Sequence, residues 1–161
     1  MSYPRSLPVS VAWSLVLVLA LFDQLTKAFI VRILPPGEEI TVFPGFLTVV
    51  HVHNTGAAFS MFHGNNLILG LLAVAVLTFL VILRGKFPGW LAGSAWVLLV
   101  SGIIGNLTDR ILRGHVVDFL DFQFGSYHWP AFNVADSCIC LAACLFLISG
   151  FSSRGAEAKK G

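Results

Sequence analysis

Acidic and amide side chains gather at three places in the second half of this 161-residue chain. They lie in three short strings: GNLTDR at 105–110, VVDF at 116–119 and FNVADS at 132–137. Two carboxylates held close together where water is scarce cannot both ionise, so one keeps its proton and the pair supplies an acid and a base. Such a pair can activate water against a peptide carbonyl and protonate the carbonyl oxygen or the leaving amine. Spacing alone does not choose between Asp109 and Asp118 as the partner of Asp136.

Each of these acids also has a structural interpretation. Asp136 directly precedes an apolar segment, where a carboxylate can cap a helix by accepting backbone N–H bonds and facing the positive end of the dipole. On composition alone, capping is the stronger interpretation of Asp136. Asp109 can form an ion pair with the adjacent Arg110, and Asp118 can be an acid of a surface loop.

A further pair of charges lies within the first apolar segment. Asp23 and Lys27 are four residues apart, a spacing that puts opposite charges on one helix face. Ionisable groups inside a spanning segment usually face the protein interior and mark a functional site. The sequence leaves two roles open for this pair, a structural ion pair or a support for the site.

Other chemistries find less support in the sequence. His51 and His53 alternate in a predicted strand and share a face, where His115 or His128 can join them to hold a metal ion. The chain has no HExxH string and no carboxylate at ligand spacing. It also lacks the GxSxG string of serine hydrolases and the Gly-rich loops that bind phosphates. We therefore interpret these histidines as interfacial residues and expect no metal site.

The composition is that of a membrane protein. Hydrophobic residues make up 57% of the chain and charged residues 11%, against about a quarter charged in soluble domains. A formal net charge of +2, with scattered basic residues, argues against a nucleic-acid partner. A bilayer core requires roughly 20 mostly apolar residues per helix. We predict a single domain over residues 1–161 with four transmembrane helices, at about 9–31, 66–84, 88–108 and 135–152.

The flanking charges predict an orientation. Basic residues near the predicted helix ends fall on one side if there are four spans: Arg5, Arg84, Lys86, Arg154, Lys159 and Lys160. By the positive-inside rule this side, with both termini, is cytoplasmic. No small-x-small cleavage site follows the first apolar segment, so we expect it to remain as a helix. An outer cap is predicted at about 36–64, with a short strand pair in ITVFPGFLTVVHVHN and a lid between about Gly56 and Asn65.

Five strings together carry a family resemblance. They are DQLTK at 23–27, NTGAAFS at 54–60, GNLTDR at 105–110, VVDF at 116–119 and FNVADS at 132–137. In this order and spacing the chain resembles bacterial lipoprotein signal peptidase (signal peptidase II) over nearly its whole length. One departure is the run VSGII before GNLTDR, where the family usually has smaller residues. Ser101 and Ile103 are therefore expected to change how closely the third and fourth helices pack.

The resemblance implies a fold and a location. The fold is that of an all-α membrane protein with four transmembrane helices, a small extracytoplasmic β-cradle and a short interfacial helix. The location implied is the bacterial inner (cytoplasmic) membrane, with the active site near the extracytoplasmic face. Membrane lipids are then the surroundings, and we expect a monomer.

The resemblance also implies an activity and its residues. The activity is that of an intramembrane aspartic endopeptidase, with Asp118 and Asp136 as the catalytic pair and no cofactor. Its substrate is a diacylglyceryl-modified prolipoprotein, cleaved before the lipidated cysteine, and its inhibitor is the cyclic peptide globomycin. The residues implied to bind substrate or support the site are Asp23, Lys27, Asn54, Gly56, Asn106, Asp109, Arg110 and Asn133.

Two other classes of function remain open from the residues alone. In a small proton-coupled transporter, Asp23, Lys27 and the later acids would relay protons. Such a relay requires acids that continue toward the cytoplasmic half of the helices, and the sequence places none there. The third class is a non-catalytic membrane scaffold that binds partners through its outer cap.

Overall fold

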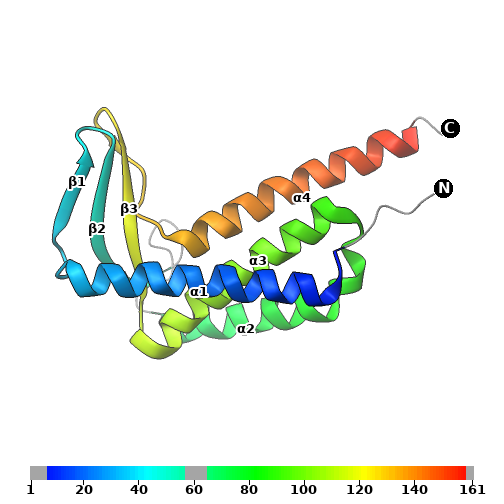
Figure 1. Ribbon diagram of the computed structural model, residues 1–161, viewed down its shortest axis with the longest axis horizontal. Helices are drawn as coiled ribbons and strands as arrows, with labels where there is room; N and C mark the ends of the chain where they lie inside the picture. The colour runs from blue at the N-terminus through cyan, green and yellow to red at the C-terminus, as the bar shows by residue number, and fades with distance from the viewer. Residues whose placement is uncertain (1–6, 57–64, 159–161) are drawn as a thin grey trace.

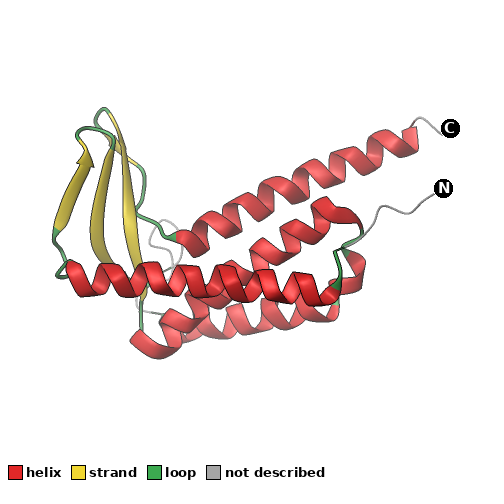
Figure 2. Cartoon of the chain, in the orientation of Figure 1, coloured by secondary structure: helices red, strands yellow, loops and turns green. Residues whose placement is uncertain are grey.

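The computed structural model describes residues 7–56 and 65–158, and within them it has four α-helices and a small antiparallel sheet at one end of the helices (Figures 1 and 2). The helices are α1 (Val9–Ile33), α2 (Asn66–Ile82), α3 (Gly89–Arg113) and α4 (Val134–Ala158). The strands are β1 (Glu39–Phe43), β2 (Leu47–Asn54), β3 (Val116–Phe124) and β4 (Tyr127–His128). The predicted combination of four helices with a small sheet is thus confirmed.

Two of the helices have the length and apolarity needed to cross a membrane. These are α1 and α3, with 25 residues each, whereas α2 and the 134–150 part of α4 are shorter apolar helices. In Figure 1, α1 begins and α4 ends at the end of the molecule away from the sheet. The sheet and the polar residues discussed below therefore occupy the opposite end.

The helix bounds differ most from the prediction at the C-terminal ends of α4, which continues to Ala158, and of α3, whose end matters for the site. This helix continues to Arg113, beyond the predicted end at residue 108, because Asp109 and Arg113 pair with each other and with neighbouring elements. It stops at Gly114, whose φ of 77° is the left-handed conformation that glycine adopts readily at helix C-termini. The added turn brings Asp109 inside the helix.

The hydrophobic core lies around α3. Trp96 is completely buried and packs with Ala12 and Val16 of α1 and Leu80 of α2. Its indole N–H donates to the Leu80 carbonyl over 2.8 Å, so the largest buried side chain leaves no polar atom unpaired. This packing fixes α3 against α1 and α2.

Glycines allow α3 to approach both α4 and Asp23 of α1 closely. A Cβ added at Gly102 would lie 2.4 Å from the Ala135 carbonyl oxygen, and one at Gly105 would lie 2.6 Å from Asp23 Oδ2. Small residues at helix contacts in membranes serve this purpose. The larger neighbours are accommodated: the Ser101 hydroxyl donates to the Val97 carbonyl of its own helix, and Ile103 packs beside the core.

The four strands form one antiparallel sheet in the order β1-β2-β3-β4. The strand pair predicted in the first outer segment corresponds to β1 and β2, which are joined through a turn at Gly45. Reasoning from the residues did not predict β3, which pairs with β2 so that Val52 faces Asp118. Residues 57–64, which include most of the predicted lid, lie outside the described residues. Within the described residues there is no separate short α-helix that matches the expected interfacial helix.

Candidate active site

A backbone contact brings the VVDF and FNVADS strings together. The N–H of Phe132 donates to the Leu120 carbonyl over 3.0 Å, and the Leu120 N–H donates back to the Phe132 carbonyl over 2.9 Å. The chain that enters α4 is therefore an extra partner of β3. As a result Asn133 lies beside Asp118, and Asp136 follows one helical turn later.

Asn133 contacts both Asp118 and Asp136, which we call the acid pair. Its Nδ2 donates to Asp118 Oδ1 over 2.7 Å, and its backbone N–H donates to Asp136 Oδ2 over 3.2 Å. Each acid has a second amide partner: Asn54 Nδ2 lies 2.8 Å from Asp118 Oδ2, and Asn106 Nδ2 lies 2.8 Å from Asp136 Oδ1. Within the described residues, the side chains that donate to the acid pair are thus uncharged amides.

Asp118 has a strongly perturbed titration. Burial, and then the negative charge of Asp136, raise the pKa of the Asp118 carboxyl from 3.8 to about 7. Hydrogen bonds from Asn54 and Asn133 and the charge of Lys27 act in the opposite direction but do not outweigh them. Asp118 therefore holds a proton near neutral pH, as expected when two carboxylates share a buried site.

The start of α4 corrects one of the structural interpretations. Asn133, not Asp136, is the residue before the helix, and its Oδ1 accepts the backbone N–H of Asp136 over 2.9 Å. Asp136 lies three residues later and its carboxylate accepts the Asn133 N–H, which is the reciprocal arrangement of a capping box. Asn133 and Asp136 therefore both cap α4 and fix the position of the Asp136 carboxylate.

A second buried group of charges lies beside the acid pair, and we call Asp23, Lys27 and Asp109 the ionic cluster. Lys27 Nζ lies 2.8 Å from Asp23 Oδ2 and 3.1 Å from Asp109 Oδ2, and all three residues are almost fully buried. The Asp23–Lys27 pairing inferred from spacing is therefore present. Lys27 Nζ also donates to Asn106 Oδ1 over 3.1 Å, so Asn106 connects the ionic cluster to Asp136.

The ionic cluster joins most elements of the molecule. Asp23 of α1 accepts the backbone N–H of Ala135 in α4 over 2.8 Å, and Asp109 of α3 accepts the N–H of Val117 in β3 over 3.0 Å. The ion pair proposed between Asp109 and the adjacent Arg110 is wrong. Asp109 pairs with Arg113, one turn along α3, whereas Arg110 Nη2 donates to the Gly56 carbonyl over 3.1 Å.

The structure thus brings nearly all the predicted site residues into one network, and it adds two that the sequence reasoning missed. Gln24 Nε2 contacts Asp23 and Asp109, and Arg113 contacts both Gln24 and Asp109. The spacing of four residues between Asp109 and Arg113 could have predicted their ion pair. It was overlooked because the helix was predicted to end at residue 108, before both residues.

The histidines considered as metal ligands have other partners. Buried His51 places Nδ1 2.7 Å from the Leu34 carbonyl oxygen, while His53 stacks on His115 with ring centroids 3.8 Å apart. Burial, followed by the nearby His115 and His51, lowers the pKa of His53. His128 lies apart and contacts Asp121 over 3.2 Å. Across residues 7–56 and 65–158, no group of three His, Cys, Asp or Glu side chains is arranged to hold a metal ion.

Comparison with known proteins identifies the family. The model of the family described as signal peptidase (SPase) II matches residues 15–152 of the chain. Curated relatives named lipoprotein signal peptidase include one from Janthinobacterium sp. (strain Marseille), 42% identical over 135 residues, covering 81% of each chain. Another, from Aeromonas hydrophila, is 40% identical over 151 residues and covers 88% of each chain. The chain belongs to the signal peptidase II family, which confirms the resemblance found in its five strings and makes it a peptidase.

Solved structures support the same assignment. One bacterial membrane enzyme, determined by the in meso method at 2.3 Å resolution, matches with a TM-score of 0.86 and 29% identity, over 96% of this chain and 94% of its own. A second such structure, at 1.9 Å resolution, matches with a TM-score of 0.76 and 29% identity, over 92% of this chain and 97% of its own. The bundle with its terminal sheet is therefore the fold of a known class of bacterial membrane enzyme.

Proposed function

We propose that the protein is an intramembrane aspartic endopeptidase that removes signal peptides from diacylglyceryl-modified prolipoproteins, cleaving before the lipidated cysteine. The observation that carries the proposal is the acid pair: Asp118 and Asp136 both contact Asn133, and the pKa of Asp118 is raised to about 7. Membership of the signal peptidase II family and the names of its relatives support the substrate.

The chemistry divides between the two acids. Asp136 lies in the first turn of α4, where the positive end of the helix dipole stabilises a carboxylate, so we assign it the ionised form and the role of base. It takes a proton from the attacking water, while protonated Asp118 donates to the oxygen of the scissile carbonyl. The proton held by Asp136 then passes to the leaving amine as the C–N bond breaks, and a hydroxyl of the tetrahedral intermediate returns its proton to Asp118. No cofactor takes part.

The surrounding amides have a separate role in this mechanism. Asn54 and Asn106 each donate to one acid of the pair and hold it in place, and Asn133 fixes the position of both. Because these donors are neutral, they orient the carboxylates without adding a positive charge that would keep both acids ionised. Arg110 is then available for the substrate peptide.

The proposed enzyme lies in the bacterial inner membrane as a monomer. All four helices span, both termini are cytoplasmic, and the sheet lies at the extracytoplasmic face. The apolar character of α2 and α4 and the position of the sheet opposite the start of α1 and the end of α4 support this topology. Because the acyl chains and signal helix of the substrate already lie in the bilayer, lateral entry avoids moving them into water. The apolar surroundings then exclude bulk water and strengthen polar contacts in the site.

The test compares two forms of one precursor. The purified protein in lipid vesicles is incubated with a diacylglyceryl-modified precursor and with the same precursor lacking the lipid, and the products are identified by mass spectrometry. We expect cleavage of the lipidated form only, immediately before the modified cysteine, and inhibition by globomycin. Equal cleavage of both forms, or cleavage at another bond, contradicts the proposed substrate.

A further inference from the structure

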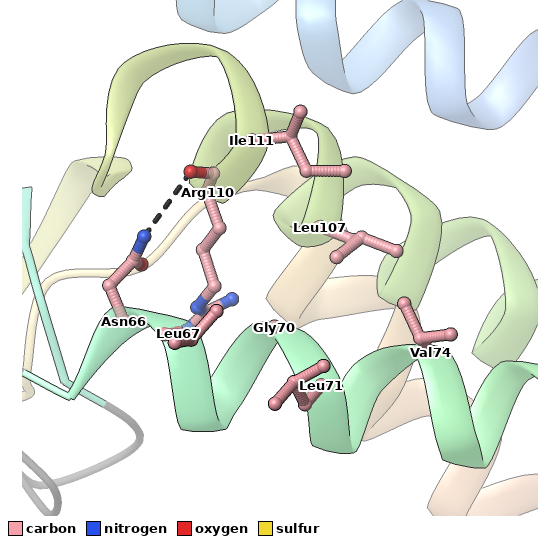
Figure 3. A pocket seen from close by; sticks show the side chains of 8 residues that line it. All are labelled: Asn66, Leu67, Gly70, Leu71, Val74, Leu107, Arg110 and Ile111. Carbon is pink, nitrogen blue, oxygen red and sulfur yellow. Dashed lines mark hydrogen bonds between the residues drawn. The ribbon is translucent and has the colours of Figure 1, made fainter.

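An apolar groove lies between α2 and α3, and its lining does not include the acid pair (Figure 3). Its volume is about 260 Å³. Its walls are Leu67, Gly70, Leu71 and Val74 of α2 and Leu107 and Ile111 of α3. Asn66 and Arg110 line the same groove, and they are its only polar lining residues in the described part of the chain.

Asn66 and Arg110 each have a buried polar atom without a hydrogen-bond partner. These atoms are Asn66 Oδ1, an acceptor, and Arg110 Nε, a donor. The orientation of the Asn66 amide is fixed because its Nδ2 donates to the Arg110 carbonyl over 3.2 Å, and turning it over would set two oxygens against each other (Figure 3). The Nη atoms of Arg110 already donate to the Gly56 and Asn106 carbonyls. Buried unpaired groups are costly, so a free donor and a free acceptor in one groove favour binding of a group that offers both an acceptor and a donor.

A donor and an acceptor in one groove match the backbone of an extended peptide residue, whose own N–H and C=O point to the same side of the chain. The carbonyl of that residue accepts from Arg110 Nε, and its N–H donates to Asn66 Oδ1. An ester of a lipid acyl chain offers acceptors alone and would leave Asn66 Oδ1 unpaired. The apolar walls then suit an aliphatic side chain of the same residue.

We propose that this groove is a subsite for the precursor peptide, in which Arg110 and Asn66 bind the backbone C=O and N–H of one residue and the α2–α3 walls bind its aliphatic side chain. This inference rests on the proposed function, since the precursor is the peptide in question. The bound residue lies near the scissile bond, because Arg110 contacts the carbonyl of Asn106, whose side chain donates to Asp136.

Gly70 provides a way to fill the groove without disturbing the fold. A Cβ added to this glycine meets no heavy atom within 4 Å, so a larger side chain can extend into the open space. Gly70→Phe is therefore the blocking variant. Gly70→Ala is the control for loss of glycine from α2, and Ala75→Phe is the control for a new aromatic ring at an exposed position of α2 outside the groove.

The experiment measures preference for an aliphatic side chain at each position of the peptide. Diacylglyceryl-modified precursors carry leucine at one position before the cleavage site and alanine at the others. We expect the wild-type protein to prefer leucine over alanine by about 10- to 100-fold in kcat/KM at one position. Gly70→Phe reduces that ratio to about 3-fold or less, while Gly70→Ala and Ala75→Phe keep most of it. An unchanged ratio in Gly70→Phe overturns the proposal.

A second measurement tests the amide. Replacing the amide of the preferred residue by an ester removes the N–H that Asn66 Oδ1 would accept. We expect kcat/KM to fall about 10-fold in the wild-type protein and to change little in Asn66→Ala. If Gly70→Phe instead alters preference among precursors with different acyl-chain lengths, the occupant is a lipid chain and the peptide subsite is wrong.

Failure of the groove proposal can be separated from failure of the proposed function. If the wild-type protein cleaves none of the precursors, the proposed function fails. The same leucine and alanine peptides are then compared by equilibrium binding, with a fluorescent label and fluorescence anisotropy. Loss of the leucine preference in Gly70→Phe supports the subsite in that assay too, and its retention overturns the proposal.

Discussion

The ionic cluster and the acid pair contain the same chemical group in two different surroundings. Asp23 and Asp109 each lie within 3.1 Å of the Lys27 ammonium, and Asp109 also pairs with Arg113. Asp118 and Asp136 receive hydrogen bonds from asparagines instead. The acids of the ionic cluster and Asp118 are buried, and Asp136 is partly buried.

This difference separates carboxylates that hold the structure from carboxylates available for chemistry. The acids of the ionic cluster are held by ion pairs that join α1 to α3, and their remaining oxygens accept backbone N–H groups of α4 and β3. A neutral amide orients a carboxylate but leaves it able to gain a proton at accessible pH. Burial together with neutral hydrogen-bond partners therefore sets Asp118 apart from the acids that contact Lys27.

The largest effect is expected from removing the charge of the acid pair. Asp118→Asn or Asp136→Asn removes the proton donor or acceptor, and we expect cleavage of the lipidated precursor to fall about a thousandfold or more. Asp121→Asn, on the same strand as Asp118 but outside the network, is the matched control and should keep most of the activity. A near wild-type rate in either variant of the pair contradicts the assigned mechanism. Cleavage is followed by gel shift of the precursor.

The ionic cluster is tested through stability. Lys27→Met leaves two buried carboxylates without their shared cation, and we expect the free energy of unfolding to fall by about 3–5 kcal/mol. Adding Asp23→Asn removes one of the two charges and should restore part of the loss. Arg32→Met, at an exposed position of the same helix, should change the free energy of unfolding by less than about 0.5 kcal/mol. Unfolding in detergent is measured by circular dichroism, and a loss no larger than that of Arg32→Met would show that the cluster is not structural.

The close approach of α3 and α4 holds the ionic cluster and the acid pair in place relative to each other. Gly102→Ala sets a Cβ against the Ala135 carbonyl, which as backbone cannot move aside easily, and we expect a loss of about 1–3 kcal/mol. Gly70→Ala, where the added Cβ meets open space, should instead gain about 0.5–1 kcal/mol because it removes a helical glycine. Thermal unfolding of the two alanine variants checks the difference in sign.

The smallest effect is a shift in pH dependence. With Asp118 acting as the proton donor, kcat/KM should decline as the pH rises above about 7. The hydrogen bond from Asn54 favours the ionised form, so its loss in Asn54→Ala raises the pKa of Asp118 and moves the decline upward by about one pH unit. Gln123→Ala, which removes an amide of the same sheet that contacts Thr48, should leave the profile unchanged. A downward shift in Asn54→Ala would assign the alkaline limb to another group.

The sequence predicted the helices and the membership of the network well, because both leave local signals. Runs of apolar residues near the bilayer thickness predict helices, and the i,i+4 spacing predicted the contact of Asp23 with Lys27. The contact of Lys27 with Asp109 had no such signal, because it joins two helices. The third strand was also missed, since residues 116–119 are buried without the alternation of a half-exposed strand.

The position of the acid pair depended on a contact that no local pattern encodes. Phe132 pairs with Leu120 through backbone groups and stacks its ring on Phe122, a contact between residues far apart along the chain that no short-range spacing indicates. That pairing sets Asn133 beside Asp118 and thereby determines which aspartate accompanies Asp136. From spacing, Asp109 and Asp118 were equally suitable, and the family resemblance supplied the choice.

The ionic cluster also has a consequence for biogenesis. The first helix leaves the ribosome with Asp23 and Lys27, while Asp109 is made only after α2 and most of α3. Inserted alone, α1 would carry two ionised groups toward the lipid, each costing roughly 2.5–3.5 kcal/mol at mid-membrane and partly offset by their mutual pairing. The remaining cost is offset only when α3 supplies Asp109. We therefore expect α1 to be weakly inserted in the bilayer early in synthesis and stably inserted once the bundle is complete.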